Sequence, residues 1–299
     1  MTNNLELKGM LFALMAALIW SGFILVSRMG GISALTPYDV IAIRYVTCAL
    51  ILFPVWLIFY RFNFFKVEFI LSAMIGGLAY AIFAFKGFEA SSALHGGILL
   101  PGLIPVFVSI LSLVVIRSSL SRAKVAGLSL IMVSITLLFY FEIFKGGKVP
   151  LGDGYFIAAA FFWALYTVLI NVWSITPWQA TCSLAFITCL IYLPIYGLWL
   201  PKNIANASIP EIALQAFYQG FLATIVQMLL YVKAVNLIGP QRMGSFMALV
   251  PVVSGSLAVL FLGEFASWYL WSALLLVSIG VLVSNLPEIF KLNFSFKRN

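Results

Sequence analysis

The residues best suited to bind a small molecule are aromatic and lie deep within long apolar stretches. Trp20 is 12 residues from Lys8, and Trp163 is 10 residues from Asp153. A helix rises about 1.5 Å per residue, so these separations correspond to roughly 15–18 Å. A ring at that depth packs against neighbouring helices, or it holds the apolar part of a ligand or a cation.

Other aromatic and polar residues fall at similar depths, and we expect them to line one cavity with the two tryptophans. The full set is Trp20, Tyr80, Phe83, Trp163, Tyr166, Gln227 and Tyr231. An amide or hydroxyl without a polar partner is costly in an apolar interior, which favours a shared cavity over separate packing sites. Because the set carries no strong charge, it favours a neutral, zwitterionic or mildly cationic ligand.

Ionisable residues are predicted near the outer ends of the third and fourth helices. They are Lys86, Glu89 and His95, which is the only histidine. Lys86 and Glu89 are three residues apart and share one helix face. Two interpretations remain open: an ion-paired rim at the outer mouth, or a gate or proton site that closes over the ligand. Arg44, seven residues into the second helix, is expected to extend to the outer interface, with ligand binding as the alternative.

The sequence offers little that could support catalysis or hold a metal or cofactor. It contains no cluster of Cys and His, and no pair of carboxylates in the centre of a predicted helix. The carboxylates near helix ends or in loops are Asp39, Glu89, Glu142, Asp153, Glu211 and Glu264. We therefore expect no enzymatic activity, no metal and no cofactor.

The apolar stretches that position these residues are long enough to span a membrane. Of 299 residues, 64% are hydrophobic and 9% are charged, whereas a soluble domain usually has about a quarter charged residues. A spanning helix needs about 20 mostly apolar residues. Ten stretches meet this need, at approximately residues 9–28, 38–60, 69–88, 93–116, 124–142, 154–173, 178–200, 212–235, 241–263 and 268–286. In the last of them, we expect Leu274 to face lipid.

The distribution of positive charge predicts the orientation. The net charge is +8, yet the basic residues form no patch for nucleic acid and sort by loop instead. The side that holds both termini carries Lys8, Arg61, Lys66, Arg117, Arg122, Lys124, Lys233, Arg242, Lys291, Lys297 and Arg298. The positive-inside rule therefore places both termini in the cytoplasm. We expect an integral multi-pass protein of the plasma membrane, the inner membrane in bacteria, that contacts lipid and acts as a monomer.

An internal repeat predicts how the ten helices are arranged. Gly9, Ala16, Ala17 and Trp20 return as Gly152, Ala159, Ala160 and Trp163, Thr36-Pro37 returns as Thr176-Pro177, and Pro54 and Pro105 return as Pro194 and Pro251. We predict two five-helix units, residues 1–147 and 148–299. A unit with five spans ends on the side opposite to its start, so its copy is inverted in the membrane. Inverted repeats of this kind support alternating access, with Pro105 and Pro251 as candidate points of flexure.

The sequence resembles the EamA-like ten-helix branch of the drug/metabolite transporter superfamily. The resemblance lies in the two Ala-Ala-x-x-Trp stretches ending at Trp20 and Trp163, in LLPGLIPVF and MALVPVVSG, and in LFLGE at residues 260–264. The first half departs from the pattern, because VIRSS at residues 115–119 stands where LGE is expected. Any role of that glutamate in the family therefore applies only to Glu264.

The resemblance implies a secondary transporter of small amphipathic metabolites, amino acids or related compounds, working as an exporter. The alternative within the superfamily is a nucleotide-sugar or sugar-phosphate exchanger, which should need cationic side chains facing the cavity. Lys233 and Arg242 are predicted at inner helix ends and Lys86 at an outer end, which argues against that alternative. An intramembrane enzyme or a receptor is the distant alternative.

Overall fold

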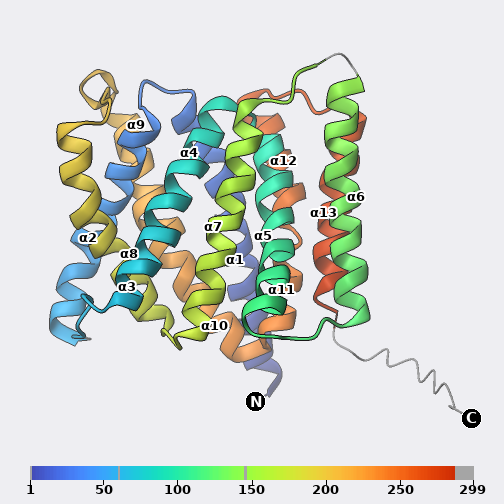
Figure 1. Ribbon diagram of the computed structural model, residues 1–299, viewed down its shortest axis with the longest axis horizontal. Helices are drawn as coiled ribbons and strands as arrows, with labels where there is room; N and C mark the ends of the chain where they lie inside the picture. Colours follow the sequence, from blue (N-terminus) through green and yellow to red (C-terminus); the bar gives the residue numbers. More distant parts are fainter. Residues whose placement is uncertain (1, 60, 145–146, 287–299) are drawn as a thin grey trace, which may run out of the picture.

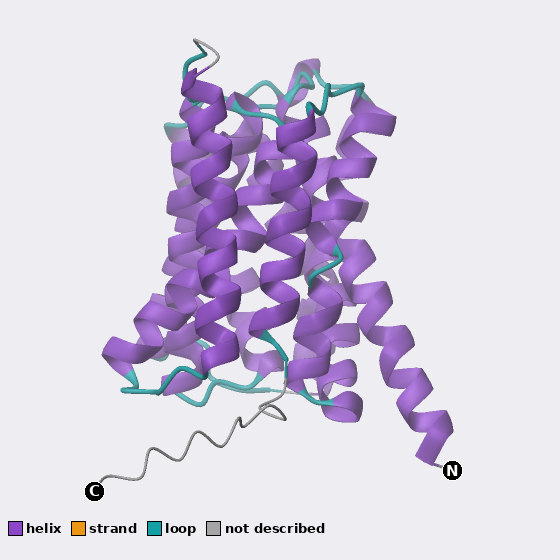
Figure 2. Cartoon of the chain, turned by 90° about the vertical axis from the view of Figure 1, so that its right-hand side faces the viewer, coloured by secondary structure: helices purple, strands orange, loops and turns teal. Residues whose placement is uncertain are grey.

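The computed structural model describes residues 2–59, 61–144 and 147–286. Regular secondary structure in these residues is entirely helical (Figure 2). The helices are α1 (Thr2–Gly31), α2 (Pro37–Phe59), α3 (Val67–Ser72), η1 (Ala73–Ala79), α4 (Tyr80–Ala90), α5 (Ala93–Val115), α6 (Arg122–Phe144), α7 (Leu151–Val172), α8 (Pro177–Leu198), η2 (Ile204–Asn206), α9 (Ile209–Gln215), η3 (Ala216–Val226), α10 (Gln227–Ile238), α11 (Pro240–Met247), α12 (Val250–Leu262) and α13 (Trp268–Ser284).

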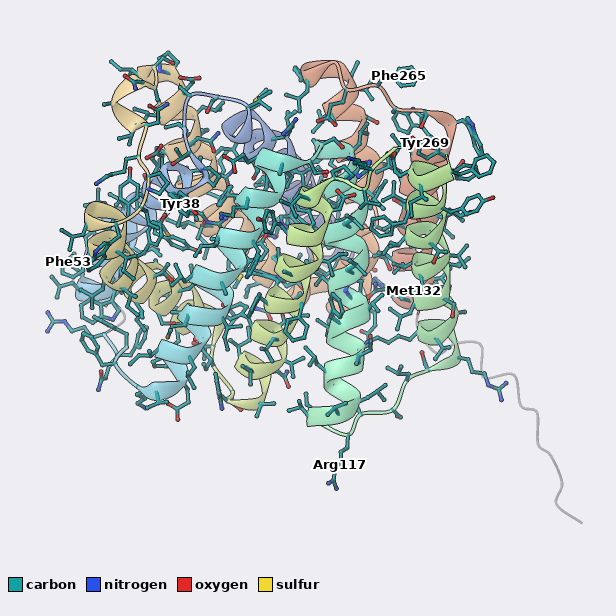
Figure 3. All side chains as sticks on the ribbon, turned by 45° about the horizontal axis from the view of Figure 1, so that its top comes forward. Tyr38, Phe53, Arg117, Met132, Phe265 and Tyr269 are labelled. Carbon is teal, nitrogen blue, oxygen red and sulfur yellow. The ribbon has the colours of Figure 1, made fainter. Side chains whose placement is uncertain are left out.

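The long helices run side by side between two faces of a bundle (Figure 1). α1 begins and α13 ends at the same face, which we call the termini face (Figure 1). The other face is called the opposite face. With all side chains drawn, Arg117 extends from the termini face, whereas Tyr269 lies toward the opposite face (Figure 3).

The prediction of ten spanning helices is confirmed for the described chain. Nine helical stretches are long and apolar enough to cross a membrane, and the tenth, α13, has 17 residues. At about 25 Å, α13 is slightly shorter than a hydrocarbon core of about 30 Å. The expectation that Leu274 faces lipid is wrong, because its side chain is fully buried while that of Leu275 is 50% exposed.

Equivalent caps begin the second helix of each half. The Thr36 amide and hydroxyl donate to Asp39 Oδ2 (2.8 and 2.9 Å), and the Asp39 amide donates to Thr36 Oγ1 (3.1 Å). Thr176 and Gln179 make the same reciprocal pair at the start of α8. The proline that follows each threonine has its φ fixed for the first helical turn. The repeated Thr-Pro pair is therefore explained by the helix cap that it forms in each half.

The third helix of each half contains a π-helical segment that the apolar pattern did not predict. η1 lies between α3 and α4, and η3 lies between α9 and α10. Tyr80 and Gln227 are the first α-helical residues after these segments. Hydrogen bonds in a π-helix run between residues five apart, so side chains lose the spacing of an α-helical face. The Gln227 amide, for example, donates to the carbonyl of Leu222, five residues earlier.

The two halves interleave instead of packing as separate bundles. α4 and α5 pack against α7, α1 packs against α10 and α12, and α6 packs along α13. The α6–α13 contact is close because Gly127 faces the backbone of Gly280 and Ser284. The Ser134 hydroxyl also donates to the carbonyl of Ala273 in α13 (2.8 Å). Small residues let membrane helices approach in this way.

We expect Gly127→Ala to destabilise the protein, because the new Cβ would overlap backbone atoms of α13 that cannot rotate away. Overpacking of this kind costs about 1–3 kcal/mol. The measurement is the thermal unfolding midpoint in detergent. Gly197→Ala is the matched control, since a Cβ at this exposed helical position meets nothing within 4 Å. An unchanged midpoint for Gly127→Ala would contradict the close approach of α6 to α13.

The two candidate prolines for flexure have different surroundings. α5 is continuous through Pro105, whereas the ninth span is divided into α11 and α12, with Pro251 in the first turn of α12. A proline in the first turn removes no helical hydrogen bond, because the amide there has no partner within the helix. Flexure at Pro105 and Pro251 stays a prediction, and it concerns two unlike positions.

Candidate functional site

Three of the predicted binding residues form an aromatic cluster where α4 meets α7. The ring of Trp163 lies 4.6 Å from that of Tyr80 and 5.2 Å from that of Tyr166, measured between centroids. Gly76 in η1 lies directly against the Tyr166 ring, and a side chain at this position would overlap it. The π-helical segment and its glycine thus make room for the cluster. We call Tyr80, Trp163 and Tyr166 the aromatic cluster.

Phe83 extends the line of rings along α4 and α7. Its ring stacks on Phe162 at 5.4 Å with an interplanar angle of 8°, and it lies 6.2 Å from Tyr155. Phe83 and Trp163 are both partly buried and pack against the main core. Aromatic faces of this kind hold apolar groups and cations.

The remaining predicted binding residues, Trp20, Gln227 and Tyr231, lie outside the aromatic cluster. Trp20 is partly buried against the same core as Trp163. Tyr231 packs in a separate cluster with Ala13 and Ala234, near the start of α1. Gln227 and Tyr231 both lie in α10, four residues apart and therefore on one α-helical face. A single cavity lined by all seven residues therefore stays a prediction.

A polar network around His95 crosses the opposite face between the two halves. His95 Nδ1 lies 2.7 Å from Asp153 Oδ2, and the Ser91 hydroxyl donates to Asp153 Oδ1 (2.6 Å). His95 Nε2 lies 3.6 Å from Glu142 Oε1, which accepts a hydrogen bond from the Tyr269 hydroxyl (2.8 Å). We call these five residues the histidine network. Asp153 is fully buried, and His95 is 6% exposed.

A second polar group joins α1, α5 and the end of α12 at the same face. The Glu264 carboxylate accepts hydrogen bonds from the amides of Ala93 (2.8 Å) and Leu94 (2.9 Å), the first residues of α5. Its charge is favourable there because the first amides of a helix have no partners within the helix. Arg28 pairs with Glu264 at 3.6 Å and donates to the carbonyl of Phe88 (2.6 Å). The glutamate of LFLGE therefore links both halves.

The expected pairing of Lys86 with Glu89 is wrong. Among the described residues, Lys86 makes no ion pair within 4 Å, and its Nζ lies 5.5 Å from the ring centroid of Tyr38 and 5.8 Å from that of Tyr155. Glu89 is exposed. Of the three residues predicted as a rim or gate, only His95 joins the networks through its side chain. The sequence had drawn attention to Glu142 and Asp153 only as carboxylates near helix ends, and to Glu264 also as the glutamate of LFLGE.

The expectation that Arg44 reaches the membrane surface is also wrong. Its side chain is buried, with a relative exposure of 5%. The guanidinium lies over the rings of Phe23 (5.5 Å) and Tyr45 (5.7 Å). Its Nε and Nη1 atoms have no hydrogen-bond partner among the described residues.

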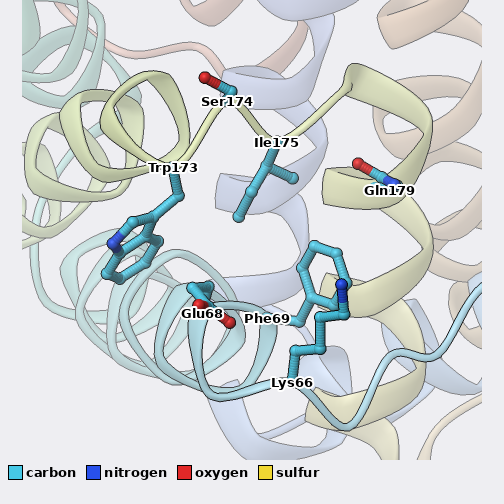
Figure 4. Close-up of a pocket in the computed structure, with 7 residues that line it drawn as sticks. All are labelled: Lys66, Glu68, Phe69, Trp173, Ser174, Ile175 and Gln179. Carbon is cyan, nitrogen blue, oxygen red and sulfur yellow. The ribbon is translucent and has the colours of Figure 1, made fainter.

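A pocket of about 290 Å³ opens at the termini face between α3, α7 and α8 (Figure 4). Its lining residues are Lys66, Glu68, Phe69, Trp173, Ser174, Ile175 and Gln179. Trp173 is seven residues beyond Tyr166, which is about 10 Å along α7. The pocket therefore lies nearer to the termini face than the aromatic cluster does, and nearer than the polar networks of the opposite face.

These features define a polytopic α-helical membrane protein with aromatic rings at the junction of two interleaved halves. The model of the EamA-like transporter family matches residues 7–140 and 150–286, so the chain belongs to this family, and the resemblance noted from its motifs is confirmed. The two matches are consecutive, and the predicted boundary at residues 147–148 falls in the gap between them.

Comparison with solved structures supports the fold. The chain is similar to a structure titled "Crystal structure of protein", with a TM-score of 0.64 and 20% sequence identity. The similarity covers 92% of this chain and 96% of that chain. No curated protein matches the sequence.

Proposed function

We propose that the protein is a secondary transporter that exports small amphipathic metabolites, amino acids or related compounds, by alternating access. The observation that carries this proposal is the position of the aromatic cluster between α4 of the first half and α7 of the second. Repeat interfaces near the membrane midplane are where transporters of this kind bind their substrates. We also propose that it acts as a monomer in the plasma membrane, with no enzymatic activity and no cofactor.

The polar networks support a closed opposite face in this conformation. The histidine network joins α5 and α6 of the first half to α7 and α13 of the second. Arg28 and Glu264 add a link between α1 and the end of α12. Opening a path to the aromatic cluster from this face would separate these pairs. We propose that their making and breaking accompanies the exchange between the two access states.

The function is tested by counterflow in proteoliposomes. Vesicles loaded with an unlabelled amino acid should accumulate the labelled compound from outside, because a carrier exchanges one for the other without an imposed ion gradient. Protein-free vesicles and vesicles with Trp163→Ala provide the controls. Counterflow of a nucleotide sugar or sugar phosphate, without any amino acid, would favour the exchanger instead. No counterflow of any of these compounds by folded protein would contradict the proposed transport.

A further inference from the structure

Arg44 lies inside the bundle, away from both faces. It is seven residues from the start of α2 at Pro37, a distance of about 10 Å along the helix axis. Among the described Lys and Arg side chains, Arg44 alone is buried. The guanidinium makes cation–π contacts with the rings of Phe23 and Tyr45. Its position is therefore fixed by packing, although its charge is not paired.

An unpaired guanidinium is unusual in the interior of a helical bundle. Arginine keeps its charge in proteins and carries five N–H donors. Burial of a charge without a partner is strongly unfavourable, so buried cations are normally paired with an anion. For Arg44, no described residue accepts a hydrogen bond from Nε or Nη1. The buried carboxylates Asp39 and Asp153 take part in other hydrogen bonds, to Thr36 and Tyr196 and to Ser91 and His95 respectively.

The surroundings of Arg44 connect it to the aromatic cluster. The hydroxyl of its neighbour Tyr45 donates to the carbonyl of Gly77 in η1 (2.9 Å). On the other side, Gly220 in η3 packs against the backbone of Arg44 and the side chain of Thr47. The stretch of α2 that carries Arg44 therefore contacts both π-helical segments, and π-helical turns occur frequently at functional sites. Gly76, next to Gly77 in η1, lies against the ring of Tyr166, a member of the aromatic cluster.

We propose that Arg44 binds the carboxylate of the substrate while the aromatic cluster holds the apolar part. The inference rests on the proposed transport function and names the substrate class: amphipathic compounds with one carboxylate, such as zwitterionic amino acids. Guanidinium recognises carboxylate through paired, charge-assisted hydrogen bonds. One buried cation suits a single negative charge, whereas a sugar phosphate or nucleotide calls for several cationic groups. Amines that lack the carboxylate are poor substrates.

Substitution of Arg44 separates a ligand-binding role from a structural one. If the guanidinium is unpaired until a substrate carboxylate binds, Arg44→Gln removes an unpaired buried charge. Ligand-free protein in detergent should then unfold at the same temperature or a higher one. A guanidinium with a structural role gives the reverse result, a lower unfolding temperature. Arg117→Gln is the matched control, because it removes the same charge from a loop at the termini face (Figure 3).

Matched ligands test the recognition itself. Binding of L-phenylalanine, L-leucine and L-methionine to the purified full chain is compared with binding of their carboxamides by calorimetry. Wild type and Arg117→Gln should prefer at least one acid over its carboxamide by tenfold or more. Arg44→Gln should reduce this preference to less than threefold, and Arg44→Lys should restore part of it.

The outcomes that overturn the inference differ from those that overturn the proposed function. An unchanged preference in Arg44→Gln, or equal wild-type affinity for acids and carboxamides, would refute carboxylate recognition by Arg44 while leaving transport intact. Wild-type counterflow of sugar phosphates but of none of the acids would also refute it. Absence of counterflow for every compound would refute the transport function as well.

Discussion

Asp153→Ala is expected to open the opposite face and to reduce transport at least tenfold. The substitution removes the carboxylate that binds both His95 and Ser91, and it leaves the buried His95 Nδ1 and Ser91 hydroxyl without a partner. Each unsatisfied buried group costs about 1–3 kcal/mol. A loss of about 3 kcal/mol would shift the balance between closed and open states by roughly 100-fold. The transporter would then spend too little time in the conformation in which this face is closed.

The shift can be measured with a cysteine at Phe83, which lies between the aromatic cluster and the opposite face. The background replaces Cys48, Cys182 and Cys189 with Ala. A membrane-impermeant thiol reagent applied to the opposite face should label Phe83→Cys slowly in the parent protein and several-fold faster with Asp153→Ala. Asp153→Asn, which keeps the size of the side chain, should give an intermediate rate and serves if the alanine variant folds poorly.

The matched control is Glu211→Ala at the same face. Glu211 makes hydrogen bonds to Ser208 that cap α9, and it takes no part in the histidine network. Its removal should leave both labelling and transport nearly unchanged. Equal labelling rates in the parent and Asp153→Ala proteins would show that the histidine network does not hold this face closed.

Trp163→Ala is expected to weaken substrate binding by about 1–3 kcal/mol, the scale of losing a well-packed aromatic anchor. This corresponds to roughly 5- to 150-fold in the dissociation constant. The ring lies between Tyr80 and Tyr166 and is itself partly buried, so it can contact a ligand on its remaining surface. Affinity should be measured for the compound with the strongest counterflow. The transport rate at saturating substrate should fall less than the affinity.

Two further variants make the result specific. Trp163→Phe keeps an aromatic face and should restore most of the affinity. Leu275→Ala removes a large apolar side chain that is 50% exposed on α13 and should have almost no effect. If correctly folded Trp163→Ala bound the substrate with wild-type affinity, the aromatic cluster would not be the binding site.

The ten helices and the repeat were determined by the sequence itself. A chain in hydrocarbon must satisfy its backbone hydrogen bonds locally, so about 20 apolar residues in a row already specify a spanning helix. The Thr-Pro pairs at residues 36–37 and 176–177 are equally local, because the cap they form involves residues only three apart. The depth of Tyr80, Trp163 and Tyr166 also follows from counting along a helix. Their ring contacts agree with that count.

Which side chains meet across helices was decided by the tertiary structure alone. η1 and η3 interrupt the α-helical spacing within the third helix of each half, and Tyr231 packs in a separate cluster with Ala13 of α1. Lys86 was expected to pair with a neighbour three residues away, but Tyr38 and Tyr155 offer their rings from other helices. His95 and Asp153 are 58 residues apart in sequence and meet only because α5 packs on α7. The side chain of Arg44 is long enough to extend to the membrane surface, but in the folded protein it lies inside the bundle, in contact with the rings of Phe23 and Tyr45.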